Sequence, residues 1–597
     1  MFTRRLIIKR FATSLLAIGM LGLPRATFAD NPQTPQEVWA SYDPRKDPLD
    51  IKKIKDWTED GANYSQFYFT SETYQGTPVR VYAIYAAPQG GKNLPALLHI
   101  HGGGQTANLN WLKFWTARGY AAMTFDYCGK WGNREHYTDY GKLDYGGMGG
   151  HQGMLETTDP SVRASKWYHW TLMARRCLTV LEREPEVDPK RMGIFGISVG
   201  GSLVWYVAGS DDRVKATCAI YGCGWNTHPK SIYAPDPKKD DPQEILWRKT
   251  MEPESYAPLI STPLLFLDAS NDQHGKMDWA YQTLATLKGP WHAAFTPYYR
   301  HHIEEEQGKD LPLFMDSVFR NGPTWPKSPE LKVTLDSNGV PQATLSPDSS
   351  GAVKKVDIFY ALKDEDPLNR FWRPVTSNQD HGAWTASLPV ANPKDRLFAY
   401  ANVVYDTGLC LTSNFVATIP SDLGPAKATD QPSLVIGDFS HGFDGFTTSS
   451  PSTDPQAFPK VMETVTGPDG VAGLHMIGRV ILWTTKLNDP KWQAPPGAKL
   501  SLQIQTPGAL DFDLVLIQND NSLESVTYSH SIHLDKKPGW QQVVLSPGDF
   551  TVDKGRNAKE GAVLDGWKPF DTLQFGSKDG DRTDGVTFAN IRWVVQK

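Results

Sequence analysis

The stretch Gly193-Ile194-Phe195-Gly196-Ile197-Ser198-Val199-Gly200-Gly201 decides the fold of the first half of the chain. The apolar residues from Met192 to Phe195 predict a buried strand, and those from Ser202 to Ala208 predict a helix. Between them lies Gly-x-Ser-x-Gly, in which glycines leave room for a sharp turn that lifts the Ser198 hydroxyl clear of the sheet. The first amides of the helix point to the place where an oxyanion would develop. The stretch therefore predicts a serine nucleophile.

Alternating strands and helices surround this turn. Residues Asp30 to Glu59 are polar and Pro-rich and predict an arm that wraps the first domain. An antiparallel pair at a sheet edge is predicted next, followed by strands and helices in alternation, at Phe67–Phe69, Val79–Tyr85, Pro95–Ile100, Ala121–Phe125 and onward to Ala294-Phe295. This order predicts an α/β domain over residues 30–325, with a mostly parallel sheet covered by helices on both faces.

A second glycine-rich motif follows the strand that ends at Ile100. It is His101-Gly102-Gly103-Gly104, and glycines at such a place let the backbone turn its amides toward a ligand. Together with Gly-x-Ser-x-Gly downstream, it makes the backbone N–H groups of Gly103 and Val199 the candidates for an oxyanion hole.

An acid and a histidine complete the predicted site. The strand that starts at Pro263 ends in a short loop that carries Asp272, our candidate for the acid, with Asp268 at the strand tip as the alternative. The loop after Ala293–Phe295 carries His301 and His302. A histidine on such a loop can take the serine proton and return it, and His301 is preferred, with His302 left open.

These motifs resemble the α/β-hydrolase superfamily, and within it the bacterial acetyl xylan esterase, cephalosporin deacetylase and dienelactone hydrolase group. The resemblance rests on the two glycine motifs, on Asn271-Asp272-Gln273-His274-Gly275 and on Arg300-His301-His302, and it spans roughly Tyr64 to Phe319. It implies a Ser198–His301–Asp272 triad, an acyl-serine intermediate and no metal or other cofactor.

Residues 1–29 predict an export signal. Arg4, Arg5, Lys9 and Arg10 form a basic head, an apolar stretch follows, and Thr27-Phe28-Ala29 is a cleavage site. The apolar stretch is too short to remain as a membrane span. The arginine pair resembles a twin-arginine signal, with an ordinary secretory signal as the alternative. Either signal predicts a periplasmic or secreted protein.

The net charge, the number of cysteines and the length of the chain limit the classes of protein it can belong to. A formal net charge of −5 over 597 residues gives no basic face for nucleic acid. Five scattered cysteines are not a disulfide framework; free buried thiols are expected, with a Cys218–Cys223 pair as the alternative. The length suggests about three domains.

Beyond Pro326-Lys327-Ser328-Pro329 the apolar period changes to two. Residues 330–420 predict a β-sandwich of fibronectin or immunoglobulin type. Residues 430–597 loosely resemble a jelly roll of the carbohydrate-binding kind, whose tryptophans could stack on sugar rings.

The sequence as a whole predicts an exported serine esterase that releases acyl groups, acetyl in the first place, from a carbohydrate. Two alternatives remain. One is a serine peptidase or acyl-peptide hydrolase on the same fold, and the other is a non-catalytic polysaccharide-binding protein.

Overall fold

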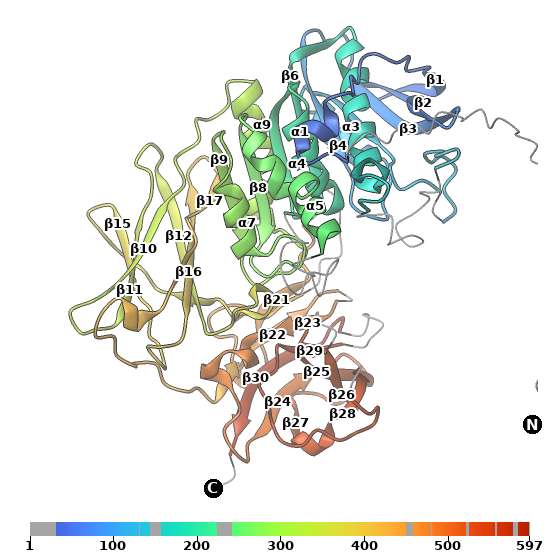
Figure 1. The fold of residues 1–597 in the computed structure, drawn as a ribbon. Coiled ribbons are helices and arrows are strands. Elements are labelled where there is room, and N and C mark those ends of the chain that lie inside the picture. The colour runs from blue at the N-terminus through green and yellow to red at the C-terminus, as the bar shows by residue number, and fades with distance from the viewer. Residues whose placement is uncertain are drawn as a thin grey trace, which may run out of the picture.

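The computed structural model describes residues 31–130, 132–143, 157–223, 241–448, 458–478, 480–520, 524–555, 558–576 and 583–595. The predicted export signal lies outside these ranges. The described chain forms an α/β part, here called the first domain, and two all-β parts, called the second domain (β10 to β18) and the third domain (β19 to β30). Figure 1 shows the second domain beside the first, and the third domain at one end of both.

The first domain is built on a nine-stranded sheet in the order β1-β2-β3-β5-β4-β6-β7-β8-β9. Strands β4 to β9 run parallel, while β1, β2 and β3 form an antiparallel edge. The bounds are β1 Lys52–Glu59, β2 Ala62–Tyr74, β3 Thr77–Pro88, β4 Leu94–Ile100, β5 Ala121–Phe125, β6 Val187–Ile197, β7 Val214–Ile220, β8 Leu264–Ala269 and β9 Trp291–Thr296. The predicted mostly parallel α/β sheet is confirmed.

Strand β1 corrects the prediction of an arm over Asp30 to Glu59. Its polar sequence Lys52–Glu59 pairs with β2 and is largely exposed, because an edge strand has a neighbour on one side only. Lysines are common on such edges, where they discourage pairing with another chain. Propensity alone therefore gave no strand signal here.

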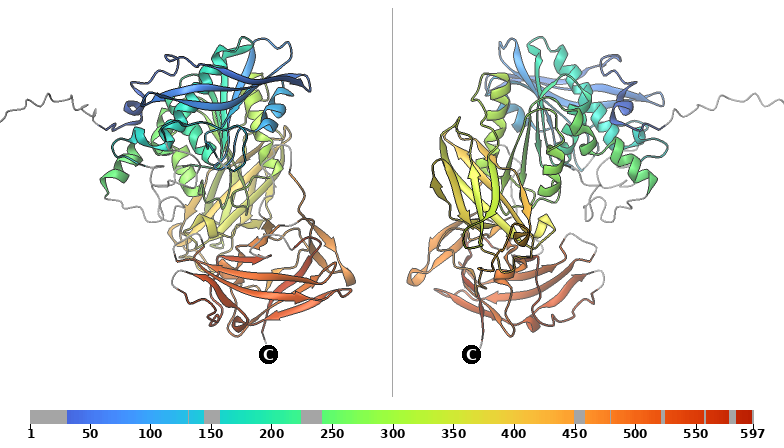
Figure 2. Two further views of the ribbon diagram at one scale, coloured as in Figure 1. Left: turned by 90° about the vertical axis from the view of Figure 1, so that its right-hand side faces the viewer. Right: turned by 60° about the vertical axis from the view of Figure 1, so that its left-hand side comes forward.

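Helices cover both faces of this sheet, as predicted, and Figure 2 shows the layers from two further directions. One core includes Trp167 and Trp170 of α3 and Trp205 of α4; the other includes Trp111 of α2 and Phe314 of α9. The bounds are α1 Pro35–Trp39, α2 Leu109–Thr116, α3 Lys166–Arg183, α4 Val199–Ser210, α5 Pro242–Thr250, α6 Pro253–Tyr256, α7 Met277–Leu284, α8 Glu305–Gly308 and α9 Asp310–Phe319. Full burial of each such large apolar side chain contributes about 1.5–3 kcal/mol.

The second domain has two antiparallel sheets around one core. Their orders are β10-β11-β15-β14 and β13-β12-β16-β17, with β18 also paired to β16. The bounds are β10 Glu330–Leu335, β11 Pro341–Ser346, β12 Val353–Leu362, β13 Arg373–Val375, β14 Asn378–Asp380, β15 Ala383–Ser387, β16 Leu397–Tyr405, β17 Cys410–Thr412 and β18 Val416–Thr418.

The third domain also encloses one core between two antiparallel sheets, ordered β21-β22-β30-β24-β27, with β19 paired to β30, and β20-β23-β29-β25-β26-β28. The bounds are β19 Val435–Gly437, β20 Thr447–Thr448, β21 Met462–Thr466, β22 Ala472–Met476, β23 Leu482–Thr484, β24 Lys499–Gln505, β25 Leu510–Gln518, β26 Val526–Leu534, β27 Gln541–Leu545, β28 Thr551–Gly555, β29 Thr572–Phe575 and β30 Thr587–Val594. The predicted period-two region is therefore antiparallel β-structure. Its assignment to immunoglobulin and jelly-roll types stays a prediction.

The structure also describes the state of the cysteines and the character of the helices. All five cysteines are free and buried, so the alternative Cys218–Cys223 disulfide is not formed. Among the described residues, no helix combines the length and the apolar character needed to cross a membrane.

Candidate active site

Ser198 lies at the turn between β6 and α4, as the motif predicts. Its backbone has φ 59° and ψ −118°, a conformation rare for a residue with a side chain. A Cβ on Gly196 would lie 2.2 Å from the Gly200 carbonyl oxygen, and one on Gly200 would lie 2.1 Å from the Ile100 oxygen. The motif needs glycine at both positions because backbone fills the space where a side chain would begin.

A chain of hydrogen bonds joins Ser198, His301 and Asp272. Ser198 Oγ is 2.8 Å from His301 Nε2, and His301 Nδ1 is 2.7 Å from Asp272 Oδ2. Asp272 is fully buried; burial would raise its pKa, but the His301 ring and its hydrogen bond hold that pKa below its usual value. An ionised Asp272 only accepts, so His301 Nδ1 carries the proton and Nε2 is free to accept the serine hydrogen.

The structure separates the alternatives that the sequence left open. Asp268 is buried beneath the site, and its Oδ1 accepts a hydrogen bond from the Ala269 amide at 2.7 Å. Burial, with the nearby charge of Asp272, raises the pKa of Asp268 well above its ordinary value. His302 contacts Glu304 at 3.4 Å. Of these residues, Asp272 and His301 are therefore the ones that lie in line with Ser198.

Two rings that the triad prediction did not include hold His301 in place. The ring of Tyr221 lies 4.2 Å from that of His301, and the ring of His274 lies 5.2 Å from it, edge to face. Burial lowers the pKa of His274 to about 3, so this second histidine stays neutral. Its place two residues after Asp272, within the motif Asn271–Gly275 that carries the family resemblance, was the signal of a role.

The turn after β4 is fixed from both sides. The buried His101 stacks on Tyr127, with ring centroids 4.1 Å apart, and its Nδ1 lies 2.7 Å from the Gly102 oxygen. The Gly102 amide donates to Gln105 Oε1 and is therefore not free to bind an oxyanion, and the Gly103 amide remains the predicted donor on this turn. Val199 is the first residue of α4, where amides are not used within the helix.

Arg134, which follows β5, is a further residue that contacts this turn and that the sequence analysis did not identify. Its guanidinium donates to the Gly104 oxygen at 2.7 Å and lies 3.4 Å from the buried carboxylate of Asp126. An arginine between a buried acid and a backbone carbonyl fixes the turn without any motif that a single sequence would show.

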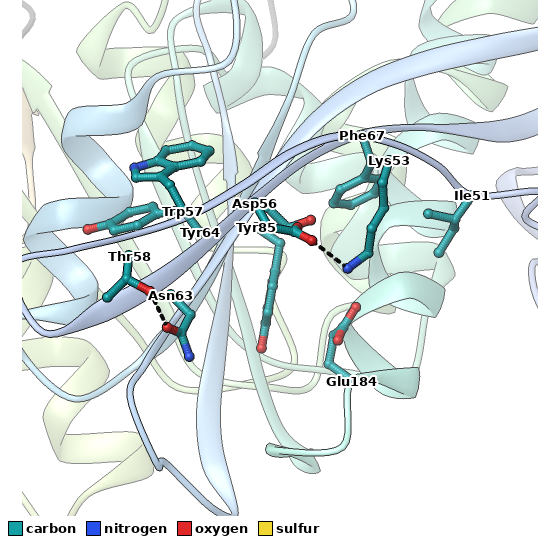
Figure 3. Close-up of a pocket in the computed structure, with 11 residues that line it drawn as sticks. Ile51, Lys53, Asp56, Trp57, Thr58, Asn63, Tyr64, Phe67, Tyr85 and Glu184 are labelled. Atoms are coloured by element: carbon teal, nitrogen blue, oxygen red, sulfur yellow. Dashed lines mark hydrogen bonds and ion pairs between the residues drawn. The ribbon is translucent and has the colours of Figure 1, made fainter.

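A separate groove lies far from these residues, at the antiparallel edge of the sheet. It encloses about 460 Å³ and is lined by β1, β2, Tyr85 of β3 and Glu184. Figure 3 shows the Trp57 ring stacked on Tyr64 and the ion pair between Lys53 and Asp56, both of β1. Glu184 follows α3 and precedes β6, so the groove lies toward the amino ends of the parallel strands, opposite to Ser198. It belongs to a different part of the molecule from the triad.

We also searched for side chains that could bind a metal ion. Within the described ranges, no group of three or more histidine, cysteine, aspartate or glutamate side chains is arranged to hold a metal ion.

A mostly parallel sheet with a serine at a sharp strand-to-helix turn and with a histidine and an acid on later loops defines an α/β-hydrolase. Residues 46–225 match the acetyl xylan esterase (AXE1) family, and residues 163–294 match the dienelactone hydrolase family. Residues 46–294 of the chain therefore form an α/β-hydrolase domain that is similar to the AXE1 and dienelactone hydrolase families.

Three individual proteins that resemble this chain share at most about a quarter of its residues over the aligned region. The uncharacterized peptidase YuxL of Bacillus subtilis (strain 168) is 24% identical over 217 residues, which span 34% of this chain and about 30% of the length of that relative. The acetyl xylan esterase from Paenibacillus sp. R4 is 18% identical, covers 46% of this chain and 90% of its own, and has a TM-score of 0.40. The glucuronoyl esterase from Solibacter usitatus is 14% identical, covers 46% of this chain and 87% of its own, and has a TM-score of 0.34.

Proposed function

We propose that this protein is an exported serine esterase that hydrolyses ester-linked acyl groups, acetyl foremost, on a carbohydrate. The observation that carries the proposal is the continuous hydrogen-bond chain from Ser198 through His301 to the buried Asp272. Such a chain activates a hydroxyl that is a weak nucleophile on its own. The AXE1 family match supports the ester class of the substrate.

In the proposed mechanism, Ser198 Oγ attacks the ester carbonyl while His301 Nε2 takes its proton. Asp272 holds the Nδ1–H tautomer and stabilises the imidazolium. The amides of Gly103 and Val199 receive the oxyanion, and each such donor is worth about 3–4 kcal/mol in the transition state. His301 then protonates the leaving alcohol, and water releases the acid from the acyl-serine.

The carbohydrate part of the proposal is supported by three features of different kinds. These are the predicted export signal, the appended domains of antiparallel sheets and the AXE1 match. We further propose that the second domain is of the fibronectin or immunoglobulin type and that the third is a jelly roll that binds carbohydrate.

The first experiment measures the activated serine. Purified protein and its Ser198→Ala variant are treated with a fluorophosphonate and weighed as intact chains. One adduct on the parent and none on the variant is the expected result. No adduct on a folded parent would contradict the triad and would favour a non-catalytic polysaccharide-binding protein.

The match to a protein described as a peptidase gives amide hydrolysis as the second candidate. Acetylated xylo-oligosaccharides and peptidyl amides compared at equal enzyme concentration separate the two. Acetate release with little amide cleavage is expected. Rapid amide cleavage without acetate release would replace the esterase proposal by the peptidase.

A further inference from the structure

The loop that carries His301 contacts both of the domains that follow the hydrolase sheet. Tyr298 begins the loop with a φ of 71°, and its ring packs on Phe371 of the second domain at 5.9 Å. Arg300, next to His301, forms a hydrogen bond with the third domain. A positive φ at a bulky residue persists only where the surroundings hold it. The loop conformation therefore depends on its neighbours in both β-domains.

The contact of Arg300 with the third domain has three parts. Its Nη2 donates to Asp520 Oδ2 at 2.5 Å and to Thr572 Oγ1 at 2.9 Å, and its guanidinium lies 4.8 Å from the Trp483 ring centroid. Asp520 follows β25, Thr572 begins β29 and Trp483 lies in β23. These strands belong to one sheet, so a single sheet of the third domain provides all three contacts of Arg300.

The Arg300–Asp520 pair is largely removed from water. The exposed fractions of the two side chains are 25% and 11%. A charge pair this shielded is weakly screened, and its loss leaves the remaining charge without compensation. Asp520 is itself fixed, because its amide donates to Asp571 Oδ2 at 2.8 Å and its Oδ2 also accepts from Thr572 at 3.2 Å. Asp520 is thus held within the third domain by hydrogen bonds that do not involve Arg300.

The loop of the catalytic acid is held in a parallel way. Asn271, next to Asp272, donates from Nδ2 to the carbonyl oxygens of Pro367, Leu368 and Arg370 in the second domain, at 3.1, 3.1 and 2.8 Å. Each β-domain therefore anchors the immediate neighbour of one triad residue.

We propose that the third domain is a working part of the catalytic site, in which Arg300 and Asp520 are positioning residues that hold His301 in line with Ser198. The proposal rests on the esterase mechanism above and adds a role for the third domain other than carbohydrate binding. The physical reason is geometric, because His301 must stay within hydrogen-bond reach of Ser198 and Asp272 at once. A displacement of about 1 Å in such a group can cost about 100-fold in rate.

The test uses the full chain and the rate of fluorophosphonate labelling. At saturation the amplitude counts folded sites, while the rate constant reports how well His301 activates Ser198. Arg300→Gln is expected to keep full amplitude and to lose about 10- to 100-fold in rate constant. With p-nitrophenyl acetate, kcat should fall by a similar factor while KM changes by less than about threefold.

Two further variants sharpen this result. Asp520→Asn keeps a polar partner without the charge and should lose less rate than Arg300→Gln. Because the two residues act as one unit, the double variant should be no slower than Arg300→Gln alone. Arg300→Lys keeps the positive charge but lacks the several N–H donors of the planar guanidinium. Its labelling rate constant should therefore lie between those of Arg300→Gln and the parent.

Lys491→Gln is the matched control. Lys491 is also a partly exposed cation, paired with the buried Asp430 at 2.8 Å and lying 5.7 Å from a tryptophan ring, but it is far along the chain from the triad loops and contacts none of these residues in the structure. Its rate constant should equal that of the parent.

The outcomes separate the two proposals. An unlabelled parent would overturn the esterase mechanism itself. Full labelling of the parent, with the same rate constant for Arg300→Gln, would overturn the positioning role alone. A lower amplitude with an unchanged rate constant would also overturn it, because that result shows a stabilising contact and nothing more.

Discussion

Asp268 and Asp272 lie in one buried site, and replacing each by asparagine should have opposite consequences. Asp272→Asn removes the acceptor that fixes the tautomer of His301 and should lower kcat by about 10⁴. Asp268→Asn should leave kcat within about threefold of the parent, because burial and the charge of Asp272 raise the pKa of Asp268 and so favour its neutral form, which asparagine resembles. The amide oxygen of the new side chain can still accept from the Ala269 amide, as Oδ1 does now.

The same substitution should change how stability depends on pH. The pKa of Asp268 is raised well above 3.8 in the folded chain. Below pH 3.8 the Asp268 carboxyl is protonated in both the folded and the unfolded chain, so it does not change how stability depends on pH. As pH rises above 3.8, the unfolded chain loses the proton and the folded chain keeps it, so stability falls by about 1.4 kcal/mol per pH unit until the folded pKa is reached. Asparagine removes this loss.

The difference in stability between Asp268→Asn and the parent should therefore be near zero at pH 4 and grow as pH rises. Each pH unit between the unfolded and the folded pKa adds about 1.4 kcal/mol to this difference, which stops growing once the pH passes the folded pKa. Thermal unfolding followed by tryptophan fluorescence at pH 4, 5, 6 and 7 measures it, with residual labelling of Ser198 as the probe specific to the first domain.

Two results would refute this reasoning. A Tm difference that does not grow with pH would mean that Asp268 is ionised in the folded chain. A kcat of Asp268→Asn as low as that of Asp272→Asn would mean that the two acids act together on His301.

Three other substitutions test the interfaces and the turn. Asn271→Ala removes the donor that three carbonyls of the second domain share, of which the Arg370 carbonyl also accepts from Thr485, and should cost about 1–3 kcal/mol, read as earlier proteolysis between the first and second domains. Gly200→Ala places a Cβ 2.1 Å from the Ile100 oxygen and should abolish fluorophosphonate labelling even where soluble protein is obtained. Arg373→Met leaves the buried Asp489 carboxylate, now 2.5 Å from the guanidinium, unpaired and should cost about 3–5 kcal/mol in the unfolding of the third domain; an unchanged Tm would contradict it.

The sequence by itself determined the α/β class of the first domain and the change to antiparallel β-structure beyond Pro329. It did so because apolar period, glycine turns and strand-to-helix order are local properties that each segment shows on its own. Ser198 could be predicted for the same reason, since steric crowding at Gly196 and Gly200 is written into the motif. The exposed strand β1 could not, because it forms through pairing with β2 and not through its own polar residues.

Only the tertiary structure decided between neighbours in the sequence. His301 and His302 are adjacent, and Asp268 and Asp272 lie four residues apart near the end of one strand, so the local pattern could favour one member of each pair but could not exclude the other. The choice depends on which side chain the packed loops turn toward Ser198.

The anchoring of these loops by distant domains was also beyond the sequence. Arg300 meets Asp520 across 220 positions of the chain, and Asn271 meets Arg370 across 99. Such contacts arise when separate cores dock, and no periodicity or motif within one segment records them. The local chain thus specified the chemistry of the site, and the docking of three domains specified its geometry.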